Sequence, residues 1–222
     1  MKYLYTTLVT SNDYIAGAVA LAYSHKKYNS KYPLIIMVTD NVTNLDLLIE
    51  SGFEFIIVPY REFINHHDYY FTINKFYAFN FVDYDRILFI DADMIILNNF
   101  DYLLETYDYY FVAHIPYKSY HPWSKIWGGL FIIHPDPTFI ERIEDTGQYY
   151  DDEHVLTEVY YNSNYFKYMH RNDEEWPLYH DNDMPHFSNN NKYWNKYHLD
   201  SCQKIEDFIK KIGSQQDIIN WK

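Results

Sequence analysis

Cysteine is nearly absent from this 222-residue chain, which contains only Cys202, and no run of apolar residues approaches the length of a membrane span. A single cysteine cannot form a disulfide within the chain, so we expect a reducing compartment, the cytoplasm. A transmembrane helix needs about 20 consecutive apolar residues, so no spanning segment is predicted. The first residues also lack the charged and apolar regions of a secretory signal peptide. We therefore expect a soluble protein.

Basic residues and glycine are scarce as well. The chain has 18 Lys and Arg against 31 Asp and Glu, a formal net charge of −13, and only 6 glycines. Because no basic stripe is available to neutralise phosphates, nucleic acid is not a predicted partner. An acidic protein can still bind a small diphosphate where a metal ion supplies local positive charge. The 26 tyrosines are compatible with such a ligand, since their rings can stack on sugars and bases.

The apolar pattern in the first 60 residues alternates between strands and helices. Strands are predicted over residues 3–9, 33–39 and 54–58, with helices over 14–26 and 45–51 between them. This order predicts parallel pairing with right-handed crossovers, and hence an α/β fold. Further along the chain, helices are predicted over residues 71–81, 100–105, 137–145, 152–161 and 204–212, and strands over 109–113, 129–134 and 165–169. The segment from 170 to 194 is too polar for a core, so it is either a disordered connector or a site-forming loop.

The most informative stretch surrounds Asp91-Ala92-Asp93. Four apolar residues, 87–90, precede it and predict a strand covered on both faces, and the apolar residues 94–97 after it predict a second short strand. In open α/β sheets, ligands bind beyond the carboxyl ends of the strands. Two carboxylates one residue apart can hold a divalent cation, which in turn can hold a diphosphate. A strand-end cap or turn explains the same two residues without a metal.

Several segments, taken in order, resemble motifs of glycosyltransferase family 8, and within it the glycogenin-like branch. The resemblance covers the chain from about residue 3 to about residue 194. The segments that carry it are Leu8 to Ala18, Asn74-Lys75-Phe76, Asp91-Ala92-Asp93, Gly128 to Ile132, Asp152-Glu153, and His186 to Trp194.

The resemblance implies a single α/β domain of the GT-A, Rossmann-like type, with a mixed, mostly parallel central sheet flanked by helices. Within residues 1–222, it implies a nucleotide-binding part over about 1–100, a sugar and acceptor side over about 101–200, and a C-terminal helix over 203–213. The implied activity is the metal-dependent transfer, with retention of configuration, of a hexose from a UDP-sugar to an acceptor hydroxyl. Glucose is the first candidate sugar, the acceptor is unknown, and a homodimer is the implied assembly.

The resemblance also assigns roles to individual residues. Asp91, Asp93 and His186 would bind the metal, Mn²⁺ by donor type with Mg²⁺ as the alternative. Asp152 and Lys75 would be catalytic. The expected contacts to the UDP-sugar are Leu8, Thr10, Tyr14, Lys75, Asp91, Ala92, Asp93, Gly128, Gly129, Asp152, Glu153, His186, Asn189 and Lys192.

Each polar candidate has a structural alternative. His186 could be an ordinary loop histidine, and Lys75 and Lys192 could be surface lysines. Helix N-caps would account for Thr10 and for Asp152 together with Asp151, and ordinary aromatic packing for Tyr14.

The chain departs from the family pattern at five motif positions and in one loop. Trp127 and Gly128 replace Asn and Ser, Glu153 replaces Gln, Asn189 replaces Gly, and Tyr193 replaces Pro. The segment between Tyr161 and His186 is shorter than in glycogenins, so no self-glucosylated tyrosine can be assigned. These departures leave two other functions open: a non-catalytic UDP-sugar-binding or self-glycosylated priming protein, and a metal-dependent pyrophosphohydrolase.

Overall fold

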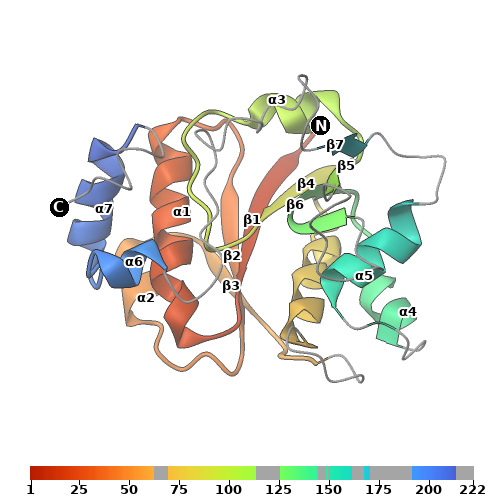
Figure 1. The fold of residues 1–222 in the computed structure, drawn as a ribbon, viewed down its shortest axis with the longest axis horizontal. Coiled ribbons are helices and arrows are strands. Elements are labelled where there is room, and N and C mark those ends of the chain that lie inside the picture. Colours follow the sequence, from red (N-terminus) through yellow and green to blue (C-terminus); the bar gives the residue numbers. More distant parts are fainter. Residues whose placement is uncertain are drawn as a thin grey trace.

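The computed structural model describes residues 1–62, 70–113, 126–144, 149, 151–161, 168–170 and 192–213. In this part of the chain a central sheet separates two groups of helices (Figure 1). The sheet has seven strands in the order β3-β2-β1-β4-β6-β5-β7. The strands are β1 (Tyr3–Val9), β2 (Leu34–Thr39), β3 (Phe55–Val58), β4 (Arg86–Ile90), β5 (Tyr110–Ala113), β6 (Ile126–Ile133) and β7 (Tyr168–His170).

The strand directions confirm the expected mixed, mostly parallel sheet. β1 pairs in parallel with both β2 and β4, β2 pairs in parallel with β3, and β5 with β7. β6 is antiparallel to both of its neighbours, β4 and β5. The parallel pairing predicted for the first three strands is therefore confirmed.

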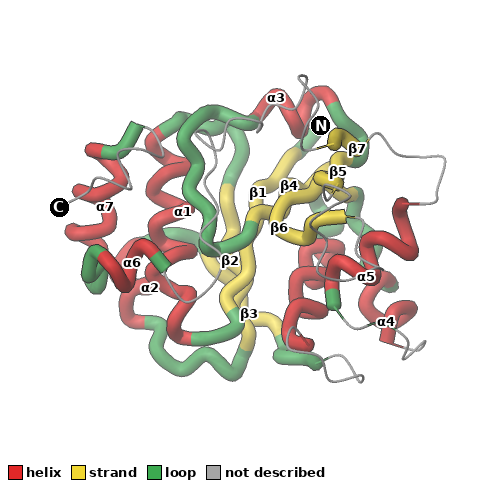
Figure 2. Tube along the Cα trace, in the orientation of Figure 1, coloured by secondary structure: helices red, strands yellow, loops and turns green. Residues whose placement is uncertain are grey.

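Helices cover both faces of the sheet, as the colours of Figure 2 make clear. The α-helices are α1 (Ile15–Lys27), α2 (Asp46–Ser51), α3 (Asp101–Thr106), α4 (Phe139–Glu144), α5 (Asp152–Leu156), α6 (Tyr193–Lys196) and α7 (Cys202–Lys211). Two 3-10 helices, η1 (Asn12–Tyr14) and η2 (Tyr70–Asn80), and a π-helix, η3 (Thr157–Tyr161), complete the set. α1, α2 and α7 pack on one face, and η2, α4 and α5 on the other. No helix within the described ranges combines the length and the apolar character that crossing a membrane requires.

The structure of β4 explains why its last four residues are all apolar. Leu88 and Ile90 belong to the core on the α1 side, whereas Ile87 and Phe89 belong to the core on the η2 side. All four are fully buried, because helices cover both faces of the strand.

The prediction of a second short strand after Asp91-Ala92-Asp93 is wrong. Met94 forms a single bridge, and residues 95–97 join no strand. The segment is nevertheless buried in the α1-side core, where the backbone N–H of Ile96 donates to Ser24 Oγ of α1 at 3.0 Å. Burial under a helix and burial in a sheet produce the same short apolar run, so periodicity could not distinguish them.

The other element predictions differ from the structure mainly at their ends. The helix expected over 152–161 is continuous but changes from α5 to the π-helix η3 at Thr157. β6 begins three residues earlier than predicted, at Ile126. Of the strand expected over 165–169, the structure describes only the part within β7. Most of the polar segment from 170 to 194 lies outside the described residues.

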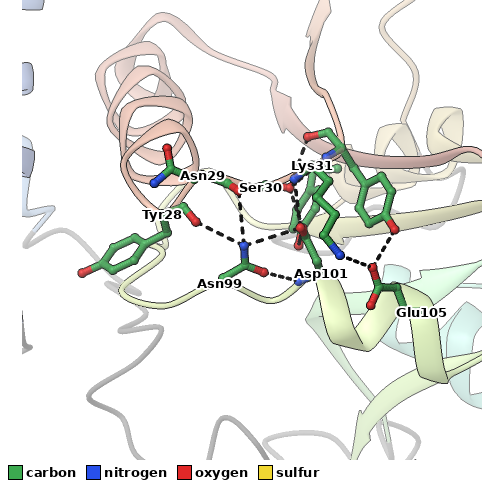
Figure 3. A network of polar contacts seen from close by, with 9 residues as sticks. Tyr28, Asn29, Ser30, Lys31, Asn99, Asp101 and Glu105 are labelled. Carbon is green, nitrogen blue, oxygen red and sulfur yellow. Dashed lines mark hydrogen bonds and ion pairs between the residues drawn. The ribbon is translucent and has the colours of Figure 1, made fainter.

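A polar network ties α3 to the connection between α1 and β2 (Figure 3). The buried Asp101 carboxylate accepts from Tyr5 Oη at 2.9 Å, from Ser30 Oγ at 2.5 Å and from the backbone N–H of Lys31 at 2.9 Å. Asn99 bridges the same carboxylate to the carbonyl of Tyr28. Because the connection precedes β2, this network lies at the amino end of that strand, and it stabilises the fold away from the carboxyl ends.

The C-terminal helices α6 and α7 lie beside α1 on the outside of the molecule (Figure 1). Lys27, the last residue of α1, reaches the end of α7 and donates to the carbonyl of Ile209 at 2.9 Å and to that of Ile212. A lysine at this position pairs carbonyls that a helix end leaves unsatisfied. The contact fixes α7 against α1 and thereby orients α6, which precedes it.

Candidate active site at the carboxyl ends of β1 and β4

The carboxyl ends of β1 and β4 meet where the strand order reverses. From β1 the chain proceeds to β2 and β3 on one side of the sheet, while β4 pairs with β1 on the other side. Such a switch point leaves room for a ligand beyond the strand ends. Thr10 follows β1 directly and is half-buried, and Asp91 follows β4 directly. Leu8, by contrast, is a buried residue within β1.

Lys75 connects η2 to three other elements at this edge. Its ammonium lies 2.9 Å from Asp91 Oδ1 and 2.8 Å from Asp152 Oδ2, and it donates to the carbonyl of Gly128 at 3.0 Å. η2, α5, β6 and the end of β4 are therefore joined through one nitrogen.

The environment of Lys75 keeps its side chain charged. Burial alone would lower the pKa of Lys75, but the carboxylates of Asp152 and Asp91 outweigh it and raise the pKa above its usual value. The ring of Phe89 lies beneath the ammonium, 5.6 Å from it. The residue is 9% exposed, so Lys75 is not a surface lysine.

Asp152 enters the site at the start of α5. Asp151 is the N-cap of this helix and accepts the backbone N–H of His154 at 2.7 Å, whereas Asp152 is the first helical residue. The backbone N–H of Asp152 donates to Thr72 Oγ1 of η2 at 3.0 Å. The N-cap explanation is therefore correct for Asp151 and wrong for Asp152, whose carboxylate is directed to Lys75.

Asp93 pairs with a second lysine on the α1 side of the sheet. The Lys192 ammonium forms an ion pair with Asp93 Oδ2 and lies 4.8 Å above the Tyr14 ring and 5.8 Å above the Trp194 ring. Burial would lower the pKa of Lys192, but the Asp93 carboxylate outweighs this and raises it. Lys192 is only 9% exposed, so the surface-lysine alternative is wrong here too.

Gly17 in the first turn of α1 allows this helix, the turn after β4 and Trp194 to approach one another closely. A Cβ atom at this position would lie 2.5 Å from the carbonyl oxygen of Ala92 and 2.6 Å from the Trp194 ring. Sequence reasoning assigned no role to Gly17, Thr72 or Trp194. An isolated glycine within a helical pattern was the available signal for Gly17, because such glycines usually have a packing reason.

A bulge in β6 shapes the other side of the site. Val112 of β5 pairs with Trp127, but the preceding Phe111 pairs with Phe131, so residues 128–130 have no partner in the ladder with β5. The carbonyl of Gly129 accepts from the backbone N–H of Asp91 at 2.9 Å. The backbone N–H of Gly128 donates to Glu153 Oε1 at 3.4 Å. Bulges often redirect groups next to functional sites, and this one directs the Gly128 carbonyl to Lys75.

Most of the expected site residues converge on this edge. Lys75, Asp91, Gly128, Gly129, Asp152 and Glu153 form one group on the η2 and α5 side, and Tyr14, Ala92, Asp93 and Lys192 form another on the α1 side. Thr10 precedes Tyr14 of the second group by four residues in the sequence. His186 and Asn189 lie outside the described residues.

Curated sequence relatives of the chain are glycosyltransferases. It is 33% identical over 130 residues to a galactinol synthase 1 of Ajuga reptans, covering 54% of this chain and 39% of that protein. It is 24% identical over 187 residues to a glycogenin of Komagataella phaffii, covering 73% of this chain and 44% of that protein. Against UDP-glucuronate:xylan alpha-glucuronosyltransferase 2 of Arabidopsis thaliana, it is 32% identical over 138 residues, 59% of this chain and 22% of that protein. The chain thus spans less than half the length of each. No protein-family model matches the sequence.

The resemblance to glycogenin-like glycosyltransferases is confirmed. Solved structures of glycosyltransferases share the fold of this chain. The galactosyltransferase LgtC, in complex with donor and acceptor sugar analogs, has a TM-score of 0.59 at 12% identity, over 94% of this chain and 96% of that chain. GlyE of Streptococcus pneumoniae has a TM-score of 0.56 at 14% identity, over 99% of this chain and 62% of that chain. The chain therefore has the expected GT-A fold.

The metal-ligand atoms that this glycosyltransferase-like site offers are oxygens, the type that hard divalent cations prefer. Asp91 and Asp93 supply carboxylate oxygens from one short turn, the ligands that Mg²⁺ and Mn²⁺ prefer. Within the described ranges, no group of three or more His, Cys, Asp and Glu side chains could hold a metal ion together. The expected third ligand, His186, belongs to the part that the structure does not describe.

Proposed function

We propose that this chain is a divalent-metal-dependent glycosyltransferase that moves a hexose, with glucose as the first candidate, from a UDP-sugar to an acceptor hydroxyl. We further propose that the anomeric configuration is retained. The observation that carries the proposal is the pair of buried lysine and aspartate contacts on either side of the Asp91-Ala92-Asp93 turn.

The two sides of this turn suit the two ends of a UDP-sugar. On the α1 side, Tyr14 offers an aromatic ring and Thr10 a hydroxyl, groups that can bind a base and a ribose. On the η2 side, Lys75 and Asp152 offer a charged donor and a charged acceptor for sugar hydroxyls. The diphosphate would then cross the turn between them.

The balance of charge in the site favours an additional cation. Four carboxylates, those of Asp91, Asp93, Asp152 and Glu153, accompany the two ammonium groups of Lys75 and Lys192. Because acidic groups outnumber basic ones, a diphosphate alone would be repelled. A divalent ion held by Asp91 and Asp93, with His186 as the expected third ligand, would neutralise charge on the leaving diphosphate.

The side chains present support specific roles in transfer. Lys192 can supply a second positive charge to the phosphates. Lys75 holds the Asp152 carboxylate in place, so that this carboxylate can bind sugar hydroxyls and stabilise positive charge on the sugar. In the proposed route, the acceptor hydroxyl attacks the anomeric carbon from the leaving-group side while the bond from that carbon to the diphosphate breaks, and a phosphate oxygen of the departing UDP takes the hydroxyl proton.

Calorimetric titration with UDP-glucose, with and without Mn²⁺, tests the metal assignment. Asp91→Ala and Asp93→Ala should each abolish the metal-dependent part of the affinity. Asp200→Ala removes an exposed carboxylate that pairs with Lys204, and it should bind like the wild type. Unchanged metal-dependent affinity in either of the first two variants would refute the assignment.

Mass spectrometry after incubation with UDP-glucose and Mn²⁺ tests the reaction type. Hexose-sized increments on an added acceptor glycan or on the chain itself, with release of UDP, support a transferase. Binding without turnover would instead indicate a sugar-nucleotide-binding protein. Release of sugar phosphate in place of UDP would indicate a pyrophosphohydrolase.

A further inference from the structure

Gly128 has no side chain at the point where a side chain would collide with Asp152. A Cβ atom built on Gly128 would lie 1.9 Å from Asp152 Oδ2 and 2.9 Å from Asp152 Cγ. Contacts this short do not occur between real atoms, so one of the two groups would have to move. The carboxylate of Asp152 therefore occupies the space that residue 128 leaves empty.

Asp152 has little freedom to move out of the way. Its side chain is 5% exposed and lies 2.8 Å from the Lys75 ammonium. Its backbone N–H is bonded to Thr72 Oγ1, and the preceding residue caps α5. With its backbone fixed on both sides, Asp152 could accommodate a side chain at residue 128 only by rotating its carboxylate away from Lys75.

Gly128 is itself fixed by its backbone. Its carbonyl accepts from Lys75 at 3.0 Å, and its N–H donates to Glu153 Oε1 at 3.4 Å. Withdrawal of the bulge from Asp152 would break these contacts and would disturb the neighbouring hydrogen bond between Gly129 and Asp91. The collision therefore cannot be relieved at Gly128 without disturbing the same group of charges.

We propose that Gly128 is the positioning residue for the carboxylate of Asp152: its missing side chain admits that carboxylate to the sugar-side group beside Lys75. The inference rests on the proposed function and adds a role for Gly128 that requires no contact with the sugar. The group that faces the donor hexose at this point is then the acidic side chain from α5. A side chain on β6 would displace it.

A double-mutant cycle between residues 128 and 152 tests this assignment. Gly128→Ala should lower the turnover of UDP-glucose by about 10- to 100-fold per UDP-binding site, because a displacement of about 1 Å suffices for such a loss. The affinity for UDP with Mn²⁺ should change by less than about twofold, since the nucleotide side of the site is untouched. A merely structural defect would instead reduce the fraction of molecules that bind UDP.

The Asp152→Ala background supplies the decisive comparison. With the carboxylate oxygen removed, Gly128→Ala should cause no further loss of turnover and no further decrease in the thermal unfolding midpoint. Gly129→Ala is the matched control, because its Cβ would meet the Trp127 ring at 2.2 Å and the three atoms nearest to it all belong to Trp127. Its effects should be the same in both backgrounds.

Equal losses from Gly128→Ala in the two backgrounds, or full turnover in Gly128→Ala alone, would overturn the proposal. Should Gly128→Ala fail to fold, recovery of folding in the double variant supports the proposal, and failure of both contradicts it. The unfolding measurements need no ligand. A wild-type chain that turns over no UDP-sugar would therefore defeat the proposed function while the cycle still decides the steric relation.

Discussion

At the scale of single residues, the buried ammonium of Lys75 bears on both stability and the proposed function. It separates the carboxylates of Asp91 and Asp152, each within 2.9 Å. Lys75→Met should leave these two acids without their shared cation and should reduce the free energy of unfolding by about 3–5 kcal/mol. Denaturant titration measures this loss. Lys31→Met is the control: it breaks the exposed pair with Glu105, and its effect on the free energy of unfolding should be small beside that of Lys75→Met.

Asp101 should make stability depend on pH in the acidic range. Burial alone would raise the pKa of Asp101, but hydrogen bonds from the Lys31 N–H and from the Ser30 and Tyr5 hydroxyls outweigh it and hold the pKa below its usual value. A carboxylate with a lowered folded-state pKa contributes stability above its unfolded pKa, about 3.9, and loses it as the pH falls through the folded value. Asp101→Asn should therefore be less stable than wild type from pH 5 to 7.

The stability gap between wild type and Asp101→Asn should narrow below about pH 4. Urea unfolding at a series of pH values provides the measurement. The exposed Asp200→Asn should follow wild type closely throughout, since its pairing with Lys204 is on the surface. A gap for Asp101→Asn that stays constant down to pH 2 would show that the hydrogen bonds do not depend on the charge of the carboxylate.

The acidic residues beside Gly128 should discriminate between donor sugars. Asp152 and Glu153 both border this glycine, and one of them lies in ionic contact with Lys75. A uronate donor would bring a third carboxylate to the same place, and like charges in close contact weaken binding. We expect UDP-glucuronate to bind more weakly than UDP-glucose by about tenfold or more, which corresponds to about 1.4 kcal/mol. Competition titration measures the ratio.

Glu153→Gln separates this charge effect from one of shape. The change removes one carboxylate while it keeps the length of the side chain and an oxygen for the Gly128 N–H. The ratio of the affinity for UDP-glucose to that for UDP-glucuronate should be smaller in this variant than in the wild type. A ratio that does not change, or a wild type that prefers the uronate donor, would contradict the electrostatic explanation.

At the scale of elements, the end of α2 depends on a glycine for a reason that the sequence already indicated. Gly52 has φ of 69° and no atom within 4 Å of the position of a Cβ, so its requirement is conformational and not spatial. Gly52→Ala should cost about 1 kcal/mol, because a Cβ strains the left-handed conformation. Gly52→Asn should cost less, since asparagine tolerates this conformation better. Chemical denaturation of the two variants compares these costs, and equal effects would point to another cause.

Local sequence patterns predicted an element well where the pattern is compatible with only one kind of structure. β1 was expected over residues 3–9 and spans Tyr3–Val9, and Gly52 was expected to end α2. The apolar residues 94–97 had two meanings, since a segment beneath α1 requires the same side chains as a strand. The sequence also gave no sign that helix 152–161 changes to a π-helix at Thr157, whose Oγ1 accepts the Ile126 N–H. That contact joins residues 31 positions apart.

At the scale of the whole molecule, the site is produced by strand order. Motif order along the chain predicted which residues would meet, because the resemblance supplied a known arrangement. The physical pairing of Lys75 with Asp152 and of Lys192 with Asp93 could not be derived from the sequence alone, since the partners lie 77 and 99 positions apart. Nor did spacing reveal that Gly128 provides the space for Asp152, which follows only from the bulge in β6 and the start of α5.

Ligand-dependent stabilisation tests whether these separate elements act as one site. The turn after β4 contacts α1 and α6 through Ala92 and Asp93, and η2 and α5 through Lys75. A ligand that binds across the turn should therefore stabilise both helical layers together. At about 100 times the dissociation constant, UDP with Mn²⁺ should add about 2.7 kcal/mol to the free energy of unfolding. For a chain of this length, that corresponds to a rise in melting temperature of about 5–10 °C.

Neither UDP nor Mn²⁺ alone should produce this rise: UDP alone brings negative charge to a site already rich in carboxylates, and Mn²⁺ alone makes none of the contacts of the nucleotide. Asp93→Asn, compared with its own ligand-free melting temperature, should lose most of the effect, whereas Asp200→Asn should retain it. Differential scanning fluorimetry with the four ligand conditions measures these shifts. A full rise with UDP alone, or an undiminished rise in Asp93→Asn, would mean that the nucleotide binds without a cation at this turn, and the charge argument for the site would then be wrong.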